Sequence, residues 1–139
     1  MASGYLLDTN VISETRKIRA DSGVMAFLAA ADAAGLYLSV LTLGELRKGI
    51  AAKRRTDPIA ARRLGEWLDS IESVFADRVL PVDAAAAKRW GELSAGGSLP
   101  VVDTLIAATA LSRGLTLVTR NLRDVQATGV PGLDPWQKR

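Results

Sequence analysis

Three carboxylates of this sequence stand among apolar residues instead of on polar stretches. Asp8 directly follows Tyr5-Leu6-Leu7, Glu45 lies inside residues 41–46 (LTLGEL), and Asp103 lies between two valines and the run TLI. Acidic side chains are seldom placed in apolar surroundings unless they are paired, hydrogen-bonded or bound to a cation. These three residues are therefore the first candidates for chemistry.

The sequence contains no cysteine and no histidine. Thiol nucleophiles, zinc sites built on these side chains and Ser-His-Asp triads are therefore excluded. Catalysis would have to use carboxylates, Lys, Tyr, Ser, Thr or a bound hard cation. Carboxylates that converge repel one another, so a cluster without His or Cys indicates Mg²⁺ or Mn²⁺.

Each acid also has an ordinary explanation as a helix cap. Asp8 followed by Thr9-Asn10 can cap the next helix, Thr42 with Glu45 has the spacing of a capping box, and Asp103 after the Pro100 loop is a plausible N-cap. The functional interpretation is favoured because all three lie where a predicted strand passes into a helix, at the rim where parallel sheets place ligands. Asp124, after the last predicted strand, is either a fourth oxygen ligand or a solvated turn residue.

Four short apolar runs predict the strands that position these acids, at residues 5–7, 36–40, 79–82 and 115–119. Helical patterns lie between them. One begins with Ser22 as its cap and ends near Gly35, and others follow Asp57-Pro58, Asp83 and Val102, the last ending at Gly114. This alternation predicts an α/β fold with a mostly parallel central sheet of about five strands flanked by helices.

The composition fits one domain over residues 1–139. The chain is 48% hydrophobic and 24% charged, with a formal net charge of +3, as in ordinary globular domains. The N-terminus has no secretion-signal pattern, and the longest uncharged stretch, residues 33–44, is too short to span a membrane. We expect a cytoplasmic protein without a membrane partner.

Four segments carry the candidate acids in order along the chain. They are residues 7–14 (LDTNVISE), 43–49 (LGELRKG), 100–110 (PVVDTLIAATA) and 117–121 (LVTRN) followed by Asp124. Together, and with the closing Pro135-Trp136, they resemble the PIN-domain ribonucleases, specifically the VapC and FitB-like toxins of type II toxin-antitoxin systems. The resemblance covers essentially the whole chain, and one departure is Val125, where many relatives have an aromatic residue.

The resemblance implies an acidic catalytic and metal site formed by Asp8, Glu45, Asp103 and Asp124. Supporting polar groups would be Thr9, Asn10, Thr119 and Asn121. It also implies a Mg²⁺- or Mn²⁺-dependent endoribonuclease in which water attacks the phosphodiester and leaves 5′-phosphate and 3′-hydroxyl ends. The implied partners are the RNA substrate, a second copy of the chain, and a cognate antitoxin through which the hetero-oligomer reaches DNA only indirectly.

A run of positive charge follows Glu45. Between residues 47 and 63 there are seven Lys and Arg side chains and one acid, Asp57. Such a run is either a solvated helix face or a phosphate-binding surface. The RNA-binding candidates are Arg47, Lys48, Lys53, Arg54 and Arg55.

Other classes of function are also compatible with the sequence. A non-catalytic PIN module that binds RNA or protein would keep the fold without turnover, and a metal-dependent DNA nuclease would use the same chemistry on another backbone. A phosphatase with Asp8 as nucleophile would need a second acid at position 10, where this chain has Asn10.

Overall fold

A five-stranded, fully parallel sheet lies at the centre of the computed structural model, which describes residues 4–136. The strand order is β3-β2-β1-β4-β5. The strands are β1 (Tyr5–Leu7), β2 (Leu36–Ser39), β3 (Val79–Leu80), β4 (Thr116–Val118) and β5 (Gly132–Leu133). The predicted α/β fold is confirmed. The fifth strand matches none of the four apolar runs, because its two residues are held by backbone bonds to β4 and not by an apolar pattern of their own.

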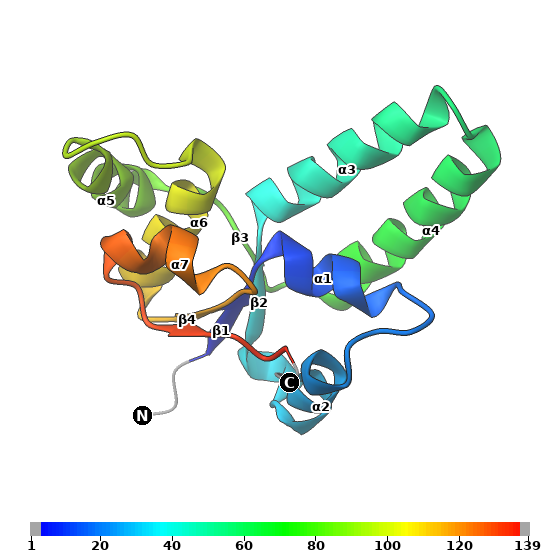
Figure 1. Cartoon of the computed structure of the whole chain (residues 1–139), viewed down its shortest axis with the longest axis horizontal. Coiled ribbons are helices and arrows are strands. Elements are labelled where there is room, and N and C mark those ends of the chain that lie inside the picture. Colours follow the sequence, from blue (N-terminus) through cyan, green and yellow to red (C-terminus); the bar gives the residue numbers. More distant parts are fainter. Residues whose placement is uncertain (1–3, 137–139) are drawn as a thin grey trace.

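Seven helices surround the sheet in the described part of the chain (Figure 1). They are α1 (Thr9–Thr15), α2 (Ser22–Ala30), α3 (Val40–Arg54), α4 (Pro58–Val74), α5 (Ala84–Ser94), α6 (Val101–Arg113) and α7 (Leu122–Val125), with short 3₁₀ turns at Ala33–Gly35 and Gln126–Thr128. None of the helices between residues 4 and 136 is both long and apolar enough to cross a membrane.

The predicted helix boundaries are partly wrong. The helix predicted from Ser22 to near Gly35 ends at Ala30, and Ala33–Gly35 forms a separate 3₁₀ turn capped by Asp32. Its N-cap is Asp21, whose carboxylate accepts the N–H of Val24, so Ser22 is the first helical residue. Other end signals are confirmed, since Asp57 and Asp83 cap their helices and Gly114 ends α6 in the left-handed region at φ 67°.

Successive residues of β1 pack into the two halves of the core. Leu6 is fully buried in a cluster with Ile106 and Leu117, on the side covered by α6. The next residue, Leu7, is buried in a second cluster with Val11 and Leu38, on the side covered by α1 and α2. Because successive strand residues point to opposite faces, the end of β1 is fixed from both sides. Asp8 follows immediately.

Helices α3 and α4 form a hairpin that projects from the sheet (Figure 1). Ile50, Ala61 and Leu68 form its own small core. Arg47 of α3 also binds two carboxylates of α4, Asp69 at 2.6 Å and Glu72 at 3.0 Å. The hairpin holds the first turns of α3 beside the carboxyl end of β1.

Candidate metal centre

Asp8 is the N-cap of α1, and its carboxylate also binds a residue that follows β4. One carboxylate oxygen accepts the backbone N–H of Thr9 at 2.8 Å, and the other accepts the hydroxyl of Thr119 at 2.7 Å and the amide of Asn10 at 3.5 Å. The backbone N–H of Asp8 donates to Val118 of β4, which continues the sheet pairing by one residue. The two interpretations of Asp8 are therefore compatible, because the cap orients the carboxylate toward neighbouring elements.

Glu45 lies in the second turn of α3 and is not part of a capping box. Ser39 caps this helix through its hydroxyl, which accepts the N–H of Leu41 at 3.0 Å. The capping-box alternative is therefore wrong, because the helix starts two residues before Thr42. The hydroxyl of Thr9 donates to Glu45 Oε1 at 2.6 Å and lies 3.1 Å from the buried hydroxyl of Thr42. Thr9 thus connects the Asp8 turn to Glu45.

Asp103 is in the first turn of α6 but is not its cap. The N-cap position is Pro100, which provides no side-chain hydrogen bond, so the capping alternative for Asp103 is wrong. Within residues 4–136 the Asp103 carboxylate has no hydrogen-bond or ion-pair partner. Burial raises the pKa of Asp103, and the negative charges of Asp8, Glu45 and Asp124 raise it further.

The pKa of Asp8 is also raised, mainly by burial, with a smaller contribution from the charge of Glu45. The hydrogen bonds from Thr119 and from the Thr9 N–H act in the opposite direction and favour the ionised form. Two of the predicted acids therefore lie where negative charge is costly, and each feels the charge of Glu45.

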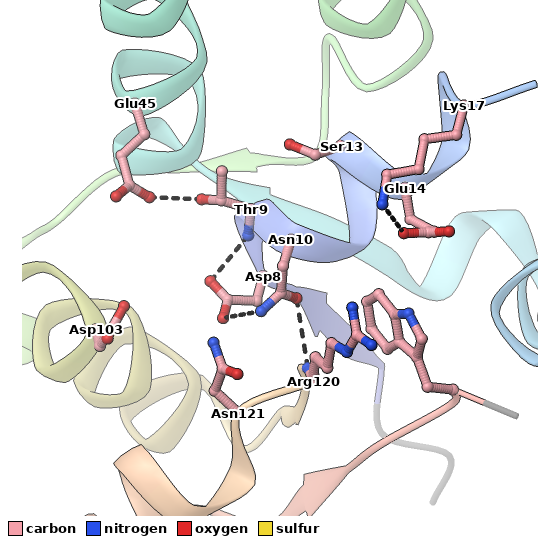
Figure 2. Close-up of a pocket in the computed structure, with 11 residues that line it drawn as sticks. Asp8, Thr9, Asn10, Ser13, Glu14, Lys17, Glu45, Asp103, Arg120 and Asn121 are labelled. Carbon is pink, nitrogen blue, oxygen red and sulfur yellow. Dashed lines mark hydrogen bonds and ion pairs between the residues drawn. The ribbon is translucent and has the colours of Figure 1, made fainter. Parts of the chain in front are cut away.

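Asp8, Glu45 and Asp103 line one cavity of about 370 Å³, shown in Figure 2. Asn10 and Asn121 also line it, whereas Asp124 is exposed on α7 and acts on the site only through its charge on Asp103. Among the described residues, no three acidic side chains are close enough together to form a complete set of metal ligands. The pocket brings the predicted acids together without closing them into a ligand set.

The chemistry of these donors fits a hard divalent cation. Four acids line the pocket, and three of them, Asp8, Glu45 and Asp103, form no ion pair among the described residues and offer only oxygen. The pKa values of Asp8 and Asp103 are raised by burial and by the charges of neighbouring carboxylates. Lys17, one of two basic residues lining the cavity, is paired with Glu14 at 2.9 Å. A bound Mg²⁺ or Mn²⁺ would relieve this repulsion and would prefer these ligands.

The remaining supporting residues lie where β4 ends. The buried hydroxyl of Thr119, which donates to Asp8, also accepts the amide of Asn10 at 3.3 Å and the backbone N–H of Asn121 at 3.1 Å. A single threonine therefore links three polar residues around the Asp8 carboxylate.

The basic candidates on α3 and at its C-cap, Arg55, divide into two groups. Arg47 is held by Asp69 and Glu72, so its guanidinium is already occupied within the chain. The others are exposed and form no ion pair among the described residues; they are Lys48, Lys53, Arg54 and Arg55.

Sequence reasoning missed five residues that line the pocket, including Ser13 of α1. Glu14 lies on α1 and Lys17 just after its end, and both follow Asn10 at the spacing of one helix face, which was the available signal. Arg120 lies between Thr119 and Asn121, two predicted site residues, but no apolar or acidic sequence pattern marks it as part of the site. Trp136 reaches the pocket only through the path of the chain after β5.

Comparison with known proteins places this arrangement in a family. The sequence profile of the PIN domain matches residues 5–128, which include all four predicted acids. The chain belongs to the PIN-domain family. The resemblance found in the four sequence segments is thereby confirmed.

This PIN domain has close relatives of nearly equal length. It is 40% identical to "VapC ribonuclease Y4jK" of Sinorhizobium fredii, over 95% of this chain and 97% of that protein. It superposes on the crystal structure of FitAcB from Neisseria gonorrhoeae with a TM-score of 0.87, at 34% identity, covering 96% of this chain and 99% of that chain. The structure of FitAB bound to the IR36 DNA fragment gives a TM-score of 0.86 at 32% identity, covering 97% of each chain.

Proposed function

We propose that this PIN domain is a divalent-metal-dependent endoribonuclease that acts as the toxin of a type II toxin-antitoxin pair. The observation that supports this most is the convergence of Asp8, Glu45 and Asp103 on one pocket, where burial and the charges of nearby carboxylates raise the pKa values of Asp8 and Asp103. Ribonuclease is also the activity in the name of the relative from Sinorhizobium fredii.

In this proposal Asp8, Glu45 and Asp103 hold the metal, and Asp124 completes or positions the site. Bound Mg²⁺ or Mn²⁺ supplies Lewis acidity and a water of lowered pKa. The chain's own polar groups keep the carboxylates in place, since Thr119 and Asn10 hold Asp8 and Thr9 holds Glu45. No histidine is available as a proton shuttle, so ionised carboxylates are the available proton acceptors near the substrate.

The exposed end of the α3–α4 hairpin would bind the RNA backbone. Lys48, Lys53, Arg54 and Arg55 are exposed and form no ion pair among the described residues, so they can neutralise phosphates. Glu45 lies on the same helix, and a strand bound along α3 would therefore lead toward the pocket.

We also propose a homodimer and a cognate antitoxin in the cytoplasm, with DNA reached only through the antitoxin. The similar structures of FitAcB and of FitAB bound to DNA support an antitoxin partner.

The test is cleavage of total cellular RNA by purified, antitoxin-free protein with Mg²⁺ or Mn²⁺, beside an EDTA control and single-stranded DNA of matched sequence. Discrete cuts that require metal, leave 5′-phosphate and 3′-hydroxyl ends, and disappear in Asp8→Asn/Asp103→Asn are expected. Products with 2′,3′-cyclic phosphates would refute the mechanism. Cleavage of DNA alone would make the protein a DNA nuclease, and binding of RNA by folded protein without cleavage would make it a non-catalytic module.

A further inference from the structure

The charged side chains are unevenly distributed around the pocket, and the Glu14–Lys17 ion pair lies on the same side of Asp8 as Arg120. In Figure 2, Glu45 and Asp103 lie on one side of Asp8, and Arg120 lies on the other. The guanidinium carbon of Arg120 is 5.3 Å from the centre of the Trp136 ring, and both residues line the cavity. A positive charge therefore stands at the edge of a site that is otherwise rich in carboxylates.

The charge of Arg120 is not neutralised by the acids around it. Among the described residues Arg120 forms no ion pair, although Asp8, Glu45 and Asp103 line the same cavity. The other basic residue of the pocket, Lys17, is paired with Glu14. The indole of Trp136 instead supports the guanidinium through a cation–π contact, which orients the group without neutralising its charge.

The backbone of Arg120 is connected to the metal-binding turn. Its N–H donates to Asn10 Oδ1 at 3.4 Å, and the amide of Asn10 in turn donates to Asp8 at 3.5 Å. These bonds are long and individually weak. The preceding residue, Thr119, adds a short bond of 2.7 Å to Asp8. The start of the Arg120 side chain is therefore fixed relative to Asp8, and its far end is supported by Trp136.

From this geometry we infer that Arg120, oriented by Trp136, binds the RNA phosphate next to the one that is cleaved. This inference rests on the proposed ribonuclease function. A strand that places one phosphate beside Glu45 and Asp103 brings its neighbouring phosphate close to the same carboxylates, and a cation is needed there to offset the repulsion. A guanidinium is always charged and has planar N–H donors that match phosphate oxygens in pairs. With Trp136 on one face of the guanidinium, its edge remains available for this contact.

Binding of a short fluorescein-labelled oligouridylate, measured by anisotropy in EDTA, tests the contact without cleavage. A single-stranded phosphate contact contributes about 0.7 to the slope of log affinity against log salt concentration. Arg120→Met is therefore expected to reduce this slope by about 0.7 and to weaken binding about tenfold at 0.1 M salt. Arg120→Lys should keep the slope, because it keeps the charge.

Arg89→Met is the matched control, since Arg89 is an exposed arginine of α5 that does not line the pocket. This variant removes the same charge and is expected to leave the slope unchanged. Trp136→Leu should weaken binding several-fold while keeping the slope, and Trp136→Phe, which retains a ring beneath the guanidinium, should restore most of the affinity. Circular dichroism and thermal melting establish that each variant is folded.

Wild-type cleavage of RNA with Mn²⁺ is measured in parallel, so that the two proposals can fail separately. If the wild type cleaves RNA but Arg120→Met keeps the full salt slope, the inference about Arg120 is wrong and the ribonuclease proposal stands. An equal loss of slope in Arg89→Met would also overturn it, because the effect would then reflect net charge alone. A wild-type protein that neither binds nor cleaves RNA would refute both.

Discussion

Replacing Asp103 by asparagine should change the stability of this PIN domain in opposite directions with and without divalent metal. Without metal, the substitution removes a negative charge from the folded state. This charge is destabilised there by burial and by the charges of Asp8, Glu45 and Asp124. Repulsions between partly exposed like charges cost a few tenths of a kcal/mol each, so three of them sum to about 1 kcal/mol. Against this, an acid in the first turn of a helix gains about 0.5 kcal/mol from the helix dipole. The variant should therefore be more stable by about 0.5 kcal/mol.

The expected change in melting temperature follows from the length of the chain. An unfolding entropy of about 2.1 cal/mol/K per residue over 139 residues makes 1 kcal/mol correspond to about 3 °C. In EDTA the variant should therefore melt about 2 °C higher than the wild type. Because the folded pKa of Asp103 is raised, this advantage exists at neutral pH, fades as the pH falls through the folded pKa, and is absent below the unfolded value of 3.8.

Metal should reverse the order. A free Mn²⁺ concentration about 100 times the wild-type dissociation constant stabilises the folded state by about 2.7 kcal/mol, or about 9 °C. If losing one carboxylate weakens binding about 100-fold, the same metal concentration raises the melting temperature of the variant by only about 1 °C. Differential scanning calorimetry across a Mn²⁺ titration measures both effects.

Asp77→Asn is the control, because Asp77 is 86% exposed and has only a 3.5 Å contact to Arg78. It should melt within about 0.5 kcal/mol of the wild type in EDTA and respond fully to metal. Two results would contradict the proposed role of Asp103 as an unpaired carboxylate that binds a cation. The Asp103→Asn protein would be less stable than the wild type in EDTA, or its melting temperature would rise as much with Mn²⁺ as that of the wild type.

Three further predictions concern other parts of the molecule. Thr9→Val removes the hydroxyl that binds Glu45 and should weaken Mn²⁺ binding by about 10- to 100-fold in calorimetric titration. Thr9→Ser keeps the hydroxyl and should bind Mn²⁺ normally. Equal Mn²⁺ binding by the two variants would contradict a positioning role for Thr9. The pKa of Glu14 is lowered by its bonds to Lys17 and to the Asp21 N–H, so its stabilising contribution is present above the unfolded value of 4.5 and is lost as the pH falls through the folded pKa. Glu14→Gln should therefore lower the melting temperature at pH 7 but not at pH 2, unlike the exposed control Glu92→Gln. Gly114→Ala, at φ 67°, should cost about 1 kcal/mol of unfolding free energy in urea, whereas Gly65→Ala inside α4, where an added Cβ meets nothing within 4 Å, should gain about 0.5 kcal/mol; effects of the same sign would refute the conformational explanation.

The sequence predicted the fold class because short apolar runs and helical periodicity are local signals. It did not predict β5, since Gly132 and Leu133 become a strand only by pairing with Leu117 and Val118. It also gave the wrong cap for α2, and the caps that it offered as alternatives for α3 and α6 are wrong as well. Ser39 caps α3 in place of Thr42, Asp21 caps α2 in place of Ser22, and Pro100 precedes α6 without a capping bond. Several neighbouring polar residues can cap a given helix, and packing of the helix chooses among them.

Residue types alone limited the chemistry that this protein can carry, because the sequence has no histidine and no cysteine. With Asp8, Glu45 and Asp103 each at the end of a strand or in the first turns of the helix after it, oxygen ligation of a hard cation was the interpretation that the sequence favoured. Only the tertiary structure decided which side chains share the pocket. It brought Arg120 and Trp136 to the pocket that Glu45 and Asp103 line, left Asp124 outside the cavity, and paired Arg47 with α4. These arrangements depend on contacts between residues far apart in the chain, and no local spacing in the sequence encodes them.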